Sequence, residues 1–450
     1  MNILISRYLI YGVFFLTPTT LAMFAPITFN NKLTSGGIVL LLSILFLTYV
    51  AKIKYQKEHL YLLMFILINI IYYFISILHY GVWPIHKDMF DTTIVLITSL
   101  ITMFTVFVYY AVIIKSKANL LLFPWLFGAG IFVNAIFAIL MYNVVSKVFD
   151  ISSTYEFRDI FYKLETDPKL DETMNTLPSI AQWVFKYYDI MGGTASIGPF
   201  LSFAATYLLI YFIFSSNKSK SIFLLFISFM AYYGAYLMAS RSSLLTPVVG
   251  IITLFLILSY QQYKKYFIIS LFVMIGLFFS IIWLVYFYSD SIPILKRLTL
   301  EVMLENQRIK LWSVALLLSL FNPFGYGYNY IWLNYAFLDG NFPFEMVFEF
   351  HHVHSVYFMT LLEFGFIGLS ILLILFYALF RGGYDNIQYF KNTPYYPIAV
   401  STMGAFIVSI FQFIFGALFV RSEAIYGGSF WLIVSMILVL SYYRRNKIEI

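Results

Sequence analysis

The stretch HSVYFMTLLEFGFIG, residues 354–368, opens with a polar pair, carries one carboxylate at Glu363 and continues as an apolar run to about residue 380. Such a run is long enough to cross a membrane as a helix. Directly before it comes a charged loop that holds Arg308 and ends in the cluster HHVH, residues 351–354. The stretch therefore predicts a transmembrane helix that begins beside a base and cations at the membrane surface.

The composition of the whole chain also indicates a membrane protein. Its 450 residues are 62% hydrophobic and 11% charged, whereas soluble domains are about 45–50% apolar and about 25% charged. Apolar runs of about 20 residues recur, which is the length of a transmembrane helix; strands of a membrane barrel would be about half as long and would alternate. We therefore expect an all-α polytopic membrane protein. The sequence contains no cysteine, which excludes disulfides and thiolate chemistry.

The apolar runs predict about 12 transmembrane helices in a single integral membrane domain that covers residues 1–450. The expected spans are residues 8–27, 34–51, 60–80, 91–114, 120–143, 195–215, 220–238, 243–260, 266–288, 354–380, 395–419 and 424–443. Two long connections, 144–194 and 289–353, interrupt them, and the second is expected to hold short surface helices. The first run lacks a small-residue cleavage site, so we expect a helix there rather than a removed signal.

The distribution of lysine and arginine predicts how these spans are oriented. One set of segments is rich in basic residues, namely Arg7, Lys52, Lys54, Lys57, Lys115, Lys117, Lys218, Lys220, Lys264, Lys265, Arg381, Lys391, Arg444, Arg445 and Lys447. The alternate short connections hold one each: Lys32, Lys87, Arg241 and Arg421. Because basic residues concentrate on the cytoplasmic side of membrane proteins, we expect both termini in the cytoplasm and the two long connections in the periplasm.

The acidic residues then fall mostly on the outer face. Of the 21 in the chain, only Glu58, Asp385 and Glu449 lie on the cytoplasmic face in this topology. The net charge of +7 follows from the topology, and no basic patch with a reading motif indicates nucleic acid as a partner. We therefore expect the polar chemistry outside, where ATP and nucleotide sugars are not available.

Two arginines are candidate ligands for phosphate. Arg241 lies in a short outward turn, and Arg308 lies in a partly amphipathic segment of the second long connection. A guanidinium binds phosphate oxygens in a bidentate way and does not deprotonate. Each residue has an alternative interpretation as an ordinary interfacial charge that pairs with a carboxylate. Lys310 is a weaker candidate for the same role.

His354 is the strongest single candidate and is expected to act as a base. It opens a predicted helix, where unpaired amides and the helix dipole disfavour imidazolium and attract anions. The alternative is a polar helix cap at the interface. The neighbours His351 and His352 raise the question of a metal, but the HHVH spacing fits no metalloprotease pattern. We therefore expect no metal and no other cofactor, and retain His352 as a candidate for substrate binding.

A loop and an intramembrane carboxylate complete the candidates. The segment NPFGYGYNY, which begins at Asn322, is rich in helix breakers and predicts a loop. Its Tyr326 and Tyr328 either present flat faces to sugar rings or pack on the bilayer surface. Glu363 lies nine residues into the predicted tenth span, so on a straight helix it would be roughly 13 Å inside the membrane. An intramembrane carboxylate is a functional candidate by default.

Three polar blocks occur in order between residues 240 and 368. They are Ser240-Arg241-Ser242 before an apolar span, Arg308 with Trp312 and Asn322-Pro-Phe-Gly325 in a long outer loop, and His354-Ser355 followed by Gly365 and Gly368. This ordered trio resembles the O-antigen polymerase and ligase superfamily. The third block and the order of the three are the specific features, whereas the first half of the chain resembles the family only in hydropathy.

The resemblance implies a glycosyltransferase of the general C-type fold in the bacterial inner membrane. Its donor would be an undecaprenyl-diphosphate-linked glycan and its acceptor another sugar chain on the periplasmic face. Arg241, Arg308 and His354 match the family's functional arginines and histidine. The chain departs from the family in one spacing. The family's polymerases have an arginine followed by fifteen residues and a glycine, whereas Gly325 lies one residue further from Arg308 than that spacing requires. The further partners expected are the lipid bilayer, a chain-length regulator and a flippase.

Polymerase and ligase remain alternatives within this superfamily. The acidic outer loop at 144–194 and the richness in aromatics, with 50 Phe and 38 Tyr, favour a polymerase that joins lipid-linked repeat units. A ligase would instead transfer the glycan to lipid A-core. A transporter or flippase is the alternative from another class, although no internal repeat is seen and the expected spans hold almost no charge besides Glu363.

Overall fold

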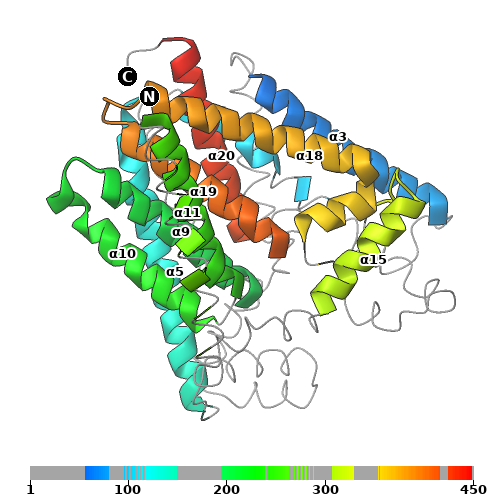
Figure 1. The fold of residues 1–450 in the computed structure, drawn as a ribbon, viewed down its shortest axis with the longest axis horizontal. Helices are drawn as coiled ribbons and strands as arrows, with labels where there is room; N and C mark the ends of the chain where they lie inside the picture. The colour runs from blue at the N-terminus through cyan, green and yellow to red at the C-terminus, as the bar shows by residue number, and fades with distance from the viewer. Residues whose placement is uncertain are drawn as a thin grey trace, which may run out of the picture.

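The computed structural model describes residues 56–80, most of 96–150, 194–238, 241–262, parts of 268–287, 307–328, 353, 355–415 and 424–447. Every regular element in these residues is a helix (Figure 1). The helices are α3 (Lys57–Tyr80), η2 (Lys117–Leu122), α5 (Phe123–Val148), α9 (Thr194–Phe214), α10 (Lys218–Leu237), α11 (Arg241–Gln262), α15 (Gln307–Phe321), α18 (Val356–Tyr389), α19 (Tyr396–Phe415) and α20 (Ala424–Arg445). Six segments, which lie in α3, η2 with α5, α9, α10, α18 and α19, are long and apolar enough to cross a membrane. The chain is therefore a multi-pass helical membrane protein.

The predicted spans and the helices agree where the two can be compared. The predictions at 60–80, 120–143, 195–215, 220–238, 243–260, 354–380, 395–419 and 424–443 each coincide with a helix. The spans predicted at 8–27 and 34–51 lie outside the described residues, and those at 91–114 and 266–288 are described only in part. The total of about twelve therefore stays a prediction. Most of the long connections 144–194 and 289–353 also lies outside the described residues.

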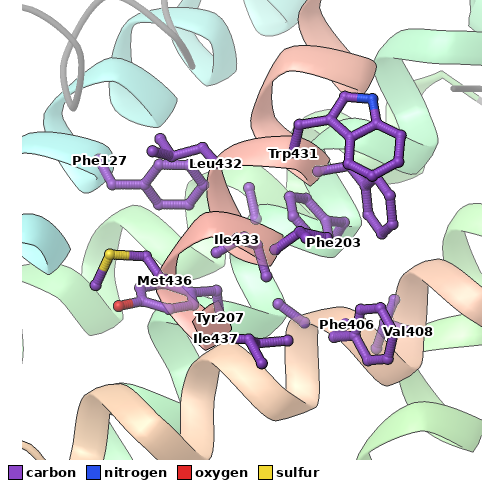
Figure 2. Packing of buried hydrophobic residues seen from close by; sticks show 14 of the residues in the cluster. Phe127, Phe203, Tyr207, Phe406, Val408, Trp431, Leu432, Ile433, Met436 and Ile437 are labelled. Atoms are coloured by element: carbon purple, nitrogen blue, oxygen red, sulfur yellow. The ribbon is translucent and has the colours of Figure 1, made fainter. Parts of the chain in front are cut away.

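Helix α9 lies at the centre of the bundle and is packed on all sides. It contacts α5, α10, α11, α19 and α20, and every residue from Ile197 to Leu208 is buried. Such a helix has no polar stripe because none of its faces meets water. The ring of Tyr207 meets Phe123 and Phe127 of α5 edge-on, at 5.5 and 5.3 Å between ring centres. Figure 2 shows this core, in which α9 and α19 surround the buried residues Trp431, Leu432, Ile433, Met436 and Ile437 of α20.

The outer faces of α3 and α10 expose large apolar side chains. These are Leu60, Leu67, Ile71 and Phe74 on α3, and Ile222, Phe223, Phe226, Phe229 and Tyr233 on α10. A soluble monomer rarely exposes a continuous apolar surface of this kind, whereas lipid tails are as apolar as these side chains. The two faces therefore form part of the lipid-facing perimeter.

A short polar turn joins α9 to α10 and caps both helices. The side chain of Asn217 accepts a hydrogen bond of 3.0 Å from the N–H of Lys220 and so caps the first turn of α10. The Lys218 ammonium donates to the carbonyls of Phe212 and Ile213, at 2.6 and 2.5 Å, and so satisfies the end of α9. The chain thus reverses between two long apolar helices through only three polar residues, 215–217.

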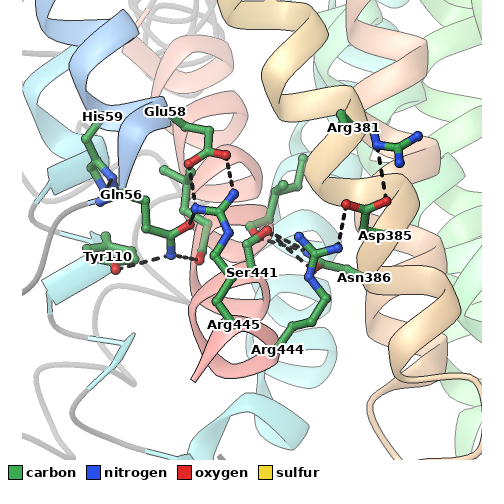
Figure 3. A network of polar contacts seen from close by, with 12 residues as sticks. Gln56, Glu58, His59, Tyr110, Arg381, Asp385, Asn386, Ser441, Arg444 and Arg445 are labelled. Atoms are coloured by element: carbon green, nitrogen blue, oxygen red, sulfur yellow. Dashed lines mark hydrogen bonds and ion pairs between the residues drawn. The ribbon is translucent and has the colours of Figure 1, made fainter. Parts of the chain in front are cut away.

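One end of the bundle is fastened by charged side chains from α3, α18 and α20 (Figure 3). The Arg445 guanidinium makes two hydrogen bonds to the carboxylate of Glu58, and a third of 3.0 Å to the side chain of Gln56. The neighbouring Arg444 lies 2.7 Å from the carboxylate of Asp385, near the end of α18. We call the group of Gln56, Glu58 and Arg445 the clasp, because it joins the start of α3 to the end of α20.

Other residues of the set predicted to be cytoplasmic lie at this same end. The ring of Phe214, at the end of α9, contacts that of Tyr396, at the start of α19, with 5.8 Å between centres. The end of α9 therefore lies beside the turn between α18 and α19. Lys57, Lys218, Lys220, Arg381, Lys391, Arg444 and Arg445 accordingly share one end of the bundle. This grouping is the one that the charge pattern of the sequence predicts.

The helix predicted to start at residue 354 is not straight, contrary to expectation. Helix α18 extends to Tyr389, but Gly365 has φ 63° and ψ −165°, which interrupts the helix. Figure 1 shows the short first part and the long second part of α18 meeting at an angle, beside α15 and the end of α3. The first part therefore does not lead into the membrane along the axis of the second. The break lies two residues after Glu363, so the depth expected for Glu363 stays a prediction.

Candidate functional site

A tight turn follows α15, and its conformation requires glycine. Asn322 closes the turn twice: its carbonyl accepts from the N–H of Gly325 at 3.0 Å, and its side-chain amide donates to the carbonyl of Gly325 at 2.8 Å. Gly325 and Gly327 have φ values of 85° and 107°, which side chains of L residues rarely adopt. A Cβ on Gly325 would also lie 2.6 Å from the carbonyl oxygen of Glu363. The turn can therefore approach α18 this closely only without a side chain at this position.

This turn lies against the break in α18 and bonds its backbone. The N–H groups of Tyr326 and Gly327 donate to the carbonyls of residues 362 and 363, at 2.9 and 3.0 Å. In the opposite direction, the N–H of Phe366 donates to the carbonyl of Pro323 at 2.9 Å. These groups would be costly to bury without partners. The turn and the break therefore form one structural unit, which we call the junction.

Helix α3 holds the other side of the junction. The hydroxyl of Tyr72 donates to the carbonyl of Phe324 at 2.5 Å, and that of Ser76 donates to the carbonyl of Tyr328 at 3.1 Å. The ring of Tyr328 is only 1% exposed and stacks on Phe364, with 6.2 Å between ring centres. Tyr328 therefore packs inside the junction, which favours the packing alternative, and its role in substrate binding stays a prediction.

Tyr326 lies at the edge of the junction and is partly exposed. Its hydroxyl donates to the carbonyl of Leu318 at 3.1 Å. Burial raises the pKa of the Tyr326 phenol above its ordinary value, so the group stays protonated and remains a donor at physiological pH. Its ring packs on the apolar cluster between α15 and α18. Its role in substrate binding stays a prediction.

Helix α15 is attached to the start of α18 through Trp312. The indole N–H donates to the carbonyl of Val353 at 3.0 Å. The ring stacks on Phe358 of α18, with 5.4 Å between centres and 15° between planes, and contacts Phe415 of α19 at 6.1 Å. A small buried cluster of Leu311, Ala315, Leu318, Val353 and Leu362 continues this contact toward the junction. Three helices therefore meet at one indole.

Helix α19 fixes the start of α18 from another side. Ser355 is fully buried, and its hydroxyl donates to the carbonyl of Phe413 at 3.4 Å. One turn further, the hydroxyl of Tyr357 donates to the carbonyl of Ile410 at 3.0 Å. Ser355 is the N-cap residue of α18, yet its side chain makes no capping hydrogen bond, because it binds α19 instead. Both neighbours of position 354, Val353 and Ser355, are thus buried and anchored.

The start of α11 lies at the same end of the bundle as the start of α18. Helices α11 and α19 run antiparallel, since Gly250 lies against Val408 and Gly404 lies against Leu254. If this register is followed back from Gly250 to Arg241, the first residue of α11, it leads to the end of α19. Helix α15 and the start of α18 are attached at that end, as described above. The starts of α11, α15 and α18 therefore lie at the same end of the bundle.

The predicted site residues fall on these elements as far as the structure describes them. Arg241 opens α11, and Arg308 and Lys310 lie in the first turn of α15, but the side chains of all three lie outside the described residues. His352 and His354 lie outside them altogether. The structure thus brings together the elements that carry the three blocks of the sequence, at the level of the backbone.

Glu363 lies beside the break, where its backbone carbonyl belongs to the junction. Its residue is 3% exposed, and its functional role stays a prediction. Within the part of the chain that the structure describes, no three His, Asp or Glu side chains gather as a metal site. His351, His352 and His354 lie outside the described residues, so the expectation of a site without a cofactor also stays a prediction.

Sequence reasoning missed Trp312 as an anchor and α3 as a support. Trp312 lies one helical turn after Arg308, so the two positions share a face of α15, and this spacing was a usable signal. Tyr72 and Phe324, by contrast, are 252 residues apart. No local pattern in the sequence connects them.

The fold defines a helical membrane protein in which α11, α15 and α18 begin at one end of the described bundle. Residues 226–373 match the O-antigen ligase family. This match supports the resemblance to the O-antigen polymerase and ligase superfamily, and the matched region includes every residue of the three blocks. The family indicates ligase- or polymerase-type glycosyl transfer. A search of curated proteins found no match to the chain.

Proposed function

We propose that this protein polymerises undecaprenyl-diphosphate-linked oligosaccharide repeat units on the periplasmic face of the bacterial inner membrane. The observation that carries the proposal is that α11, α15 and α18 all begin at the end of the bundle where α19 ends, opposite the clasp. Arg241, Arg308 and position 354 belong to those three starts. The match of residues 226–373 to the O-antigen ligase family supports the class of reaction.

In the proposed mechanism, Arg241 and Arg308 bind the diphosphate of the donor glycan. They stabilise the negative charge that grows on the diphosphate as the bond from its oxygen to the anomeric carbon breaks. His354 accepts the proton of an acceptor sugar hydroxyl, whose oxygen forms the new bond to the anomeric carbon. Direct displacement inverts that centre and releases undecaprenyl diphosphate. The arginines take the place of a metal ion in this scheme.

Secondary contacts come from residues around these three. Lys310 and His352 are proposed to bind phosphate or sugar, and Tyr326 to contact a sugar ring from the edge of the junction. Glu363 is proposed to act from its buried position beside the break. Both termini are placed in the cytoplasm, and a chain-length regulator and a flippase are the proposed protein partners.

The proposal is tested with purified protein and the lipid-linked glycan that accumulates in cells lacking this chain. The wild-type protein should lengthen that glycan in detergent, without an ion gradient and in the presence of a chelator. His354→Ala and Arg241→Ala should each lower the rate by at least about 100-fold. Arg381→Ala is the matched control, because its side chain is exposed at the opposite end. Lengthened glycan made at the normal rate by either site variant would overturn the assignment.

Transfer of the glycan to lipid A-core is the second candidate, because the matched family is that of the O-antigen ligase. The two activities leave different products in cells that lack the chain. Without a polymerase, lipid A-core carries single repeat units. Without a ligase, long lipid-linked glycan accumulates and lipid A-core stays bare. A transporter would show neither activity, since the solubilised protein would neither lengthen the glycan nor transfer it to lipid A-core.

A further inference from the structure

We propose that Trp312 is a positioning residue that fixes the segment carrying His354 relative to the helical turn carrying Arg308. The inference rests on the proposed function in so far as these two residues act together on one substrate. Its structural basis is the single indole at which α15, α18 and α19 meet.

The hydrogen bond of Trp312 acts on the peptide unit that leads into position 354. The indole N–H donates to the carbonyl of Val353 at 3.0 Å. That carbonyl and the amide nitrogen of the next residue belong to one planar group. A bond to the carbonyl therefore restricts rotation of the whole peptide unit. On the far side of position 354, the buried Ser355 is bound to the carbonyl of Phe413, so the segment is anchored on both sides.

The stacking of the Trp312 ring fixes the direction in which its N–H donates this hydrogen bond. The ring stacks on Phe358 with 15° between the planes and also contacts Phe415. The indole cannot turn without losing these contacts, which are favourable beyond the area they bury. Because Arg308 precedes Trp312 by one helical turn, the same ring also fixes the rotation of α15 about its axis. The indole thus relates position 308 to position 354.

Substitution of Trp312 by phenylalanine separates the packing of the ring from the hydrogen bond of the indole N–H. Trp312→Phe keeps an aromatic ring between Phe358 and Phe415 but has no N–H for the carbonyl of Val353. Trp283→Phe is the matched control, since Trp283 is 54% exposed on another helix and its ring contacts that of Phe287, with 4.9 Å between ring centres. Each substitution removes one indole, but only Trp312→Phe removes the hydrogen bond to the carbonyl of Val353.

The kinetic test uses purified full-length protein and the lipid-linked glycan from cells lacking the chain. For Trp312→Phe we expect kcat to fall roughly tenfold while KM changes less than about twofold, because misplacement of a reacting group acts on the chemical step. The melting temperature should stay within about 2 °C of the wild type. In a His354→Ala background, Trp312→Phe should cause no further loss, since the group that it positions is gone.

Hydrogen–deuterium exchange tests the positioning without any substrate. In nanodiscs, peptides that cover residues 353–356 should exchange faster in Trp312→Phe than in the wild type or in Trp283→Phe. Unchanged exchange with unchanged kcat would overturn the proposal, as would a loss of activity that follows a loss of thermal stability. A further loss in the His354→Ala background would also overturn it. If the wild-type protein does not act on lipid-linked glycan, the proposed function fails, and the exchange experiment still decides whether Trp312 orders this segment.

Discussion

Gly365 is the residue on which the geometry of the junction depends most directly. Its φ of 63° and ψ of −165° lie in a region that is almost restricted to glycine. A Cβ there would overlap the carbonyl of Pro323 and the backbone of Phe324, and would lie 2.7 Å from the nitrogen of Gly325. Any side chain at this position therefore strains the backbone and also displaces the turn.

Gly365→Ala should destabilise the folded protein by at least about 3 kcal/mol, from strain and overlap together. The measurement is the fraction of monodisperse protein that survives heating in detergent. Gly276→Ala is the control, because a Cβ at Gly276 would have no atom within 4 Å. Equal heat resistance of the two variants would show that the turn at Gly325 can move away from α18 with little loss of free energy.

At the scale of helices, the clasp joins the first described helix, α3, to the last, α20. Glu58 is buried, with 3% of its side chain exposed, whereas the side chain of Arg445 is 35% exposed. The carboxylate depends on Arg445 for charge compensation, since taking a charge out of water without a partner is costly. The ends of α3 and α20 are far apart in the chain, so this pair also closes the bundle.

Arg445→Ala should lower the free energy of unfolding by about 2–3 kcal/mol, which is less than the cost for a fully buried pair because Arg445 keeps part of its hydration. Lys447→Ala, an exposed neighbour, should change it by less than about 0.5 kcal/mol. The double variant Glu58→Gln with Arg445→Ala should cost less than the sum of the two single changes. Strict additivity in thermal unfolding would mean that the two side chains do not interact in the membrane.

The bundle as a whole has a basic end and an end that holds the junction and the starts of α11, α15 and α18. If the basic end is cytoplasmic, the two ends differ in their access to a membrane-impermeant thiol reagent. The chain has no cysteine, so single cysteines report without background. Ser313→Cys in α15 should be labelled from the periplasm, and Lys391→Cys, between α18 and α19, only after the inner membrane is opened. The opposite pattern would invert the proposed topology and move the site to the cytoplasm.

The sequence predicted the helical class and the positions of long apolar helices because apolar runs report directly on burial in lipid. It also predicted the loop at Asn322. The bend in α18 was not predictable, because glycine also occurs in straight membrane helices. The φ of Gly365 depends on Pro323 and Gly325, which belong to a turn that is distant in the sequence. The burial of Tyr328 depends likewise on Phe364 and on α3, and no local pattern encodes such contacts.

The interrupted α18 differs in one respect from the discontinuous helices of secondary transporters. Those helices hold ions and substrates with the carbonyl and amide groups that the interruption leaves open. In this protein, the carbonyls of Leu362 and Glu363 and the amide of Phe366 are already bonded to Tyr326, Gly327 and Pro323. An ion that entered at this point would have to compete with the chain's own backbone hydrogen bonds. The interruption therefore redirects the polypeptide without creating a cargo site, and selectivity for a substrate has to come from side chains elsewhere.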